Sequence, residues 1–65
     1  MQVFVNGEPV TIKPGRLSDV LASLGYECEK VAVAVNETFV PRRTWNLREL
    51  KKDDRVDVLA AIQGG

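Results

Sequence analysis

The sequence contains no histidine and only one cysteine, Cys28. Typical zinc sites combine several cysteine and histidine ligands, and a Cys–His nucleophile pair needs both residue types. The five glycines are dispersed, so a Gly-rich phosphate-binding loop is missing as well. These absences predict a chain that is not an enzyme by itself and that binds neither a metal nor a cofactor.

Long apolar runs and an excess of one charge are also missing. No apolar stretch approaches the roughly 20 residues that span a bilayer, and residues 1–5 do not resemble a signal peptide. Nine basic residues balance nine acidic ones, whereas nucleic-acid binders carry a basic patch. We therefore expect a cytoplasmic protein with no nucleic-acid and no membrane partner, and the shortage of cysteine agrees with a reducing compartment.

What is present fits one small globular domain spanning residues 1–65, with a tail at 62–65. Hydrophobic residues make up 45% of the chain and charged residues 28%, which are globular proportions. A domain of this size buries only about 60% of its unfolded surface, so we expect marginal stability.

Short apolar stretches separated by turn signals predict five strands. We expect them at residues 2–5, 10–13, 31–35, 39–40 and 55–61. The pair Asn6-Gly7 is a strong hairpin signal, residues 44–50 read as a helical turn or irregular crossover, and residues 51–54 as a charged turn.

One helix is expected between the second and third strands. Leu17, Val20, Leu21 and Leu24 repeat at helical spacing and would share one face. Ser18 is the expected N-cap, and Gly25 suits the left-handed residue that ends a helix. The order predicts an α+β domain of the ubiquitin-like β-grasp type, a mixed sheet with the helix packed on one face.

Two apolar residues are expected on the other face of the sheet. If the valines of the first and last strands face the helix, a period of two turns Phe4 and Leu59 outward. The first and last strands of a β-grasp sheet are neighbours, so these side chains should lie close together. They would form a partner interface or be two scattered exposed residues, and the sequence leaves both readings open.

The chain ends in Gly64-Gly65, which is either a frayed end or a working tail. A terminal carboxylate is a poor acyl donor, but adenylation gives it a leaving group that a sulfur nucleophile can displace. Glycine lacks Cβ, so such a tail can enter a narrow channel in a partner enzyme. A bulky residue at Gly65 would crowd the reacting carbonyl, and one at Gly64 would obstruct the channel.

Several stretches together are similar to the ThiS family, the small sulfur carriers of thiamine biosynthesis. They are residues 1–6, residues 33–42 followed by Trp45, the turn at 52–54, and Gly64-Gly65. The resemblance implies that a ThiF-type adenylating enzyme uses ATP to activate the Gly65 carboxylate. A cysteine desulfurase relay then supplies sulfur for a thiocarboxylate, and thiazole synthase receives it. Partner contacts are expected at four apolar residues: Phe4, Leu59, Ala61 and Ile62.

Other β-grasp carriers serve molybdopterin synthesis, tRNA thiolation or cysteine synthesis, and they stay open as alternatives. A ubiquitin-like protein modifier and a non-covalent binding module with an inert tail are two further hypotheses. The molybdopterin carrier is usually longer than this chain.

Three other features have a functional and a structural reading. Cys28 could relay sulfur, but no activating neighbour is evident in the sequence. Trp45 could anchor a partner, although packing of the crossover against the core is favoured. Arg42 and Arg43 could contact an acidic partner surface, but a solvated pair is the favoured interpretation.

Overall fold

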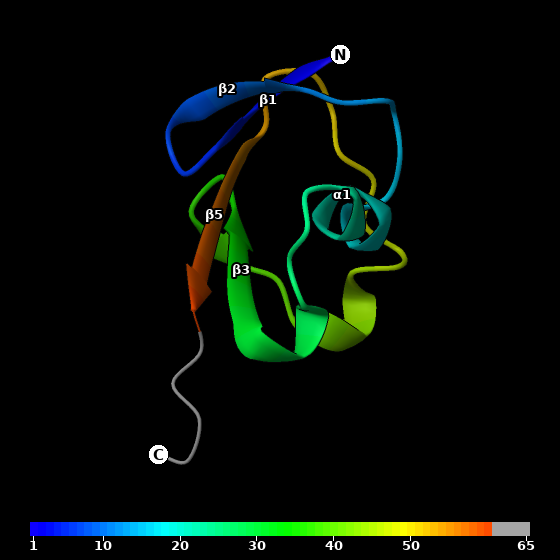
Figure 1. Cartoon of the computed structure of the whole chain (residues 1–65), viewed down its shortest axis with the longest axis vertical. Helices are drawn as coiled ribbons and strands as arrows, with labels where there is room; N and C mark the ends of the chain where they lie inside the picture. Colours follow the sequence, from blue (N-terminus) through cyan, green and yellow to red (C-terminus); the bar gives the residue numbers. More distant parts are fainter. Residues whose placement is uncertain (61–65) are drawn as a thin grey trace.

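The computed structural model describes residues 1–60, which form five strands and one helix. The strands assemble into one sheet in the order β2-β1-β5-β3-β4, and α1 lies against one face (Figure 1). The β1–β5 pair is parallel and the other pairs are antiparallel. This confirms the predicted mixed sheet of the β-grasp fold. The elements in chain order are β1 (Gln2–Val5), β2 (Glu8–Thr11), α1 (Leu17–Ser23), η1 (Cys28–Lys30), β3 (Val31–Val35), β4 (Thr38–Phe39), η2 (Arg42–Thr44) and β5 (Arg55–Ala60).

The first hairpin follows from the Asn6-Gly7 pair, as predicted. Both residues have positive φ, 52° and 84°, which is the backbone of a two-residue turn that matches strand twist. Such a turn pairs Val5 directly with Glu8. The return strand therefore begins at Glu8 and ends at Thr11, earlier than the predicted 10–13.

The helix begins at Leu17, and the prediction of Ser18 as its N-cap is wrong. Arg16 occupies the cap position without a side-chain cap hydrogen bond. The Leu17 N–H donates to the Arg48 carbonyl at 2.7 Å and the Ser18 N–H to the Trp45 carbonyl at 3.2 Å. Backbone carbonyls from a distant segment thus replace the local cap. Gly25, with φ of 89°, follows the last turn as predicted.

The core lies between α1 and the inner face of the sheet. Three residues of the helical repeat, Leu17, Val20 and Leu21, are buried, whereas Leu24 at the helix end is 36% exposed. The inward-facing valines alternate with outward residues along β1, β3 and β5. They are Val3, Val5, Val33, Val35, Val56 and Val58.

Two asparagine side chains flank β5 and extend its hydrogen bonding. The Val58 N–H donates to Asn6 Oδ1 at 2.8 Å, beyond the last residue of β1. On the other side, the Arg55 N–H donates to Asn36 Oδ1 at 3.0 Å. Both asparagines sit in left-handed turn positions, with φ of 52° and 51°. The two hairpin turns therefore also hold the strand that leads to the C-terminal tail.

Replacing Asn6 with glycine should destabilise the domain by about 1–3 kcal/mol, because the Val58 N–H loses its acceptor. Glycine keeps the positive φ accessible, so the turn itself stays unstrained when the side-chain acceptor is removed. The free energy of unfolding would be measured by urea denaturation, with Asn46→Ala at an exposed asparagine as the matched control. Equal stability of Asn6→Gly and the wild type would refute the role of this hydrogen bond.

Candidate functional site

Four of the predicted site residues, Ala61, Ile62, Gly64 and Gly65, lie outside the residues that the structure describes. The structure does describe the strand that precedes them. β5 runs between β1 and β3, and its last residue, Ala60, pairs with Val31. Pairing with Val31 of β3 thus fixes the place in the sheet where β5 ends.

Phe4 and Leu59 both lie on the outer face of the sheet, as predicted, but they do not lie close together. Phe4 is half-buried and pairs with Arg55 at the start of β5, whereas Leu59 is 67% exposed and pairs with Ala32 of β3. Arg55 and Leu59 are four residues apart, which is about 13 Å along a strand. The predicted proximity is wrong because the β1–β5 pairing covers only the start of β5.

The apolar neighbours of Leu59 belong to β3 and β4, and the predicted neighbour Phe4 is not among them. Ala32 lies directly opposite it, and Ala34, two residues further along β3, pairs with Phe39 of β4. Phe39 is 65% exposed. These four residues, Ala32, Ala34, Phe39 and Leu59, are called the Leu59 patch. Exposed apolar surface of this kind marks interaction sites, and this surface lies beside the end of β5.

Sequence reasoning missed Phe39, although a signal was available. Within the predicted strand at 39–40, a period of two puts Phe39 and Val40 on opposite faces. Val40 is buried at 5% exposure, which leaves Phe39 outside. Phe4, by contrast, lines a charged hollow with Gly7, Glu37, Arg55 and Asp57.

Trp45 packs in the core, which confirms the favoured interpretation. Its side chain is 2% exposed, and its Nε1–H donates to the Val40 carbonyl at 2.8 Å. Cys28 is half-buried in η1 and is a free thiol. It lines a shallow hollow with Glu29, Lys30 and Arg42.

Within residues 1–60, no buried polar or charged side chain is found, and no three Cys, Asp or Glu side chains gather as metal ligands would. In the same part of the chain, no helix has the length and apolar character needed to cross a membrane.

The chain is similar to known proteins over nearly its whole length. The profile of the ThiS family matches residues 3–65. The chain is 38% identical to the sulfur carrier protein ThiS of Thermus thermophilus, over 97% of this chain and 98% of that one. Its fold is similar to the crystal structure of the thiamine biosynthesis protein ThiS from Geobacter metallireducens, with a TM-score of 0.87, 28% identity and full coverage of both chains.

A longer protein also matches. The whole chain aligns with part of a thiazole synthase of Magnetococcus marinus at 39% identity, and it spans 20% of that protein's length. A carrier-like segment is therefore joined to a thiazole synthase in one relative.

Proposed function

Because the chain belongs to the ThiS family of sulfur carrier proteins of thiamine biosynthesis, we propose that it carries sulfur as a thiocarboxylate at Gly65. Proteins of this family are carriers and not enzymes, and they bind no cofactor of their own. The observation that supports the proposal most directly is that the family profile runs through the fold to the final Gly64-Gly65.

The chemistry begins with activation of the Gly65 carboxylate. A ThiF-type partner binds ATP, and a carboxylate oxygen attacks the α-phosphorus, so that pyrophosphate leaves and an acyl-adenylate forms. A persulfide of a cysteine desulfurase relay then attacks the carbonyl carbon and AMP leaves. A thiol reductant cleaves the S–S bond of the resulting acyl disulfide, which releases the thiocarboxylate. The catalytic groups belong to the partners, while this chain supplies the reacting carbonyl. Gly64 and Gly65 lack Cβ, which leaves the carbonyl open to attack.

The test is direct. The protein would be incubated with its adenylating partner, ATP and a sulfur source, and its intact mass would be measured. We expect one oxygen at the C-terminus to be replaced by sulfur. An unchanged mass with a partner that is competent on another carrier would contradict the proposal.

Thiazole synthase is the proposed acceptor of the sulfur. The relative in which a carrier-like segment is joined to a thiazole synthase supports this choice over acceptors in molybdopterin, tRNA or cysteine metabolism. In solution, the thiocarboxylated protein should lose its sulfur when purified thiazole synthase and its other substrates are added.

The Leu59 patch is the proposed contact surface for the adenylating enzyme, and Ala61 and Ile62 stay predicted partner contacts. Leu59→Glu should weaken binding about tenfold or more, because a charge would then be placed in an apolar contact. The side chain is 67% exposed, so the fold should be unaffected. Phe4 stays a predicted partner contact, separate from this patch.

Calorimetry with the adenylating enzyme would measure the affinity. Leu47→Glu is the matched control, because Leu47 is 74% exposed but does not belong to the patch. Equal affinities for the two variants would rule out the patch as the contact surface.

A further inference from the structure

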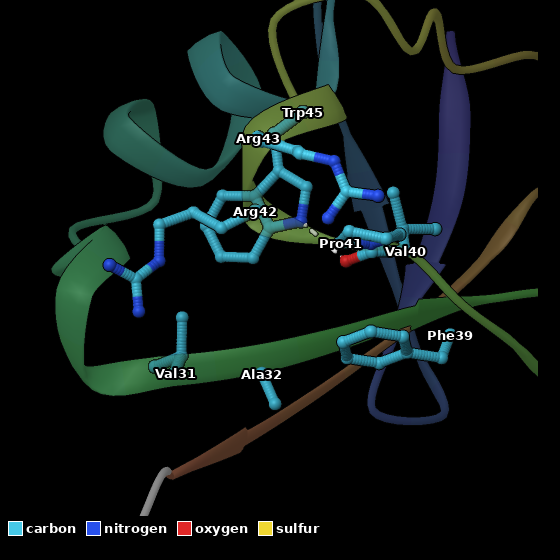
Figure 2. A pocket seen from close by; sticks show the side chains of 8 residues that line it. All are labelled: Val31, Ala32, Phe39, Val40, Pro41, Arg42, Arg43 and Trp45. Atoms are coloured by element: carbon cyan, nitrogen blue, oxygen red, sulfur yellow. Dashed lines mark hydrogen bonds between the residues drawn. The ribbon is translucent and has the colours of Figure 1, made fainter.

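An open groove of about 660 Å³ lies beside β3, where β4 ends after two residues and the chain turns away at Pro41. Figure 2 shows its walls: Val31 and Ala32 of β3 on one side, and η2 with Pro41 on the other. The groove is mainly apolar. Its lining residues are Val31, Ala32, Phe39, Val40, Pro41, Arg42, Arg43 and Trp45.

The wall formed by η2 is held rigidly. The Trp45 indole is 2% exposed and its Nε1–H donates to the Val40 carbonyl at 2.8 Å, which ties η2 to the end of β4. The Thr44 hydroxyl donates to the Pro41 carbonyl at 2.8 Å. The groove is therefore formed in the free protein, so a ligand would not need to order it.

The charged side chains that line the groove are both basic. Arg42 and Arg43 are exposed, and in Figure 2 their guanidinium groups extend in different directions from η2. No acidic residue lines the groove, and within residues 1–60 neither arginine takes part in an ion pair. Glu29 lines the neighbouring hollow with Arg42. Arginine binds carboxylates through two parallel hydrogen bonds, so the pair favours an acidic ligand.

The groove is continuous with the Leu59 patch. Ala32 and Phe39 belong to both, because they lie on the outer face of the sheet and also line the groove. A protein bound over Leu59 and Phe39 would therefore also reach Arg42 and Arg43. One partner can therefore contact both regions.

We propose that the groove, which we call the arginine groove, binds an acidic segment of the adenylating enzyme. An apolar side chain of that segment occupies the space beside Val31 and Pro41, and its carboxylates pair with Arg42 and Arg43. The inference rests on the proposed function, since it deepens the recognition of the same partner. Recognition then has an apolar part at Leu59 and an electrostatic part at η2.

The experiment measures binding to the adenylating enzyme by calorimetry, without ATP, at several salt concentrations. The double variant Arg42→Gln/Arg43→Gln should bind about tenfold more weakly or worse at low salt, and its affinity should depend less on salt. The double variant Lys13→Gln/Arg16→Gln removes the same charge from exposed residues that do not line the groove. It should bind as the wild type does.

The outcomes separate this inference from the proposed function. A wild type that becomes thiocarboxylated, together with arginine variants of unchanged affinity, overturns the arginine groove alone. Arginine-dependent binding without any thiocarboxylate supports the groove and overturns the proposed function alone. Absence of wild-type binding overturns both. Urea unfolding of each variant confirms that the exposed substitutions leave the fold intact.

Discussion

Deletion of Gly65 is expected to abolish thiocarboxylate formation. The shortened chain still ends in a glycine, but its carboxylate stands one residue, about 3.3–3.6 Å, short of the position reached by the wild type. A displacement of about 1 Å from the productive geometry can cost about 100-fold in rate, so no modified protein should be detected by intact mass. The fold should be unchanged, because the sheet and the helix are formed by residues 2–60.

A substitution at the same position separates the effect of tail length on the reaction rate from the effect of an added side chain. Gly65→Ala keeps the length but adds a Cβ beside the reacting carbonyl, so the rate of thiocarboxylation should fall, though less than on deletion. Gly15→Ala is the matched control, because a Cβ there would meet only the Lys13 carbonyl oxygen at 3.8 Å. Full activity of the shortened protein would place the reacting group somewhere other than Gly65.

Trp45→Ala should unfold much of the population at room temperature. Replacing a buried tryptophan with alanine costs about 3–5 kcal/mol, and a chain of this length has a total stability of only about 3–10 kcal/mol. The loss goes beyond the volume of the side chain, because the indole Nε1–H also donates to the Val40 carbonyl, and alanine leaves that carbonyl without its donor.

Circular dichroism during urea titration would measure the effect, since Trp45 is the only tryptophan and fluorescence is lost with it. Trp45→Phe is the control for packing: it fills part of the volume but leaves the Val40 carbonyl without its donor. We expect a loss of about 1–3 kcal/mol from that hydrogen bond. An alanine variant as stable as the phenylalanine variant would show that packing around the indole contributes little.

Much of the fold could be predicted because its signals are local. The Asn6-Gly7 turn, the helical spacing of Leu17, Val20 and Leu21, and the alternation along β5 each act over a few residues. The start of α1 could not be predicted in the same way. Its first N–H groups are satisfied by carbonyls of Trp45 and Arg48, which are distant in sequence, so no residue near Ser18 carried the information.

In the candidate site too, the features set by local sequence could be predicted and those set by distant residues could not. The outward orientation of Leu59 follows from a period of two, and the structure confirms it. Its neighbours depend on strand register: β3 brings Ala32 to Leu59 and Phe39 beside them, while Phe4 lies at the other end of β5. The arginine groove depends on η2 lying opposite β3, whereas the sequence predicts only a helical turn or irregular crossover at residues 44–50.

The position of β5 has a consequence for synthesis of the protein. Of the strands within residues 1–60, β5 is the last to leave the ribosome, yet it lies at the centre of the sheet, paired in parallel with β1 and in antiparallel with β3. β1 therefore cannot pair with β5 until residues 55–60 have been synthesised. Such non-local pairing forms late in folding. A chain truncated before β5 has neither the central strand nor the Leu59 surface. An enzyme that recognises the Leu59 patch would therefore not bind a chain truncated before β5.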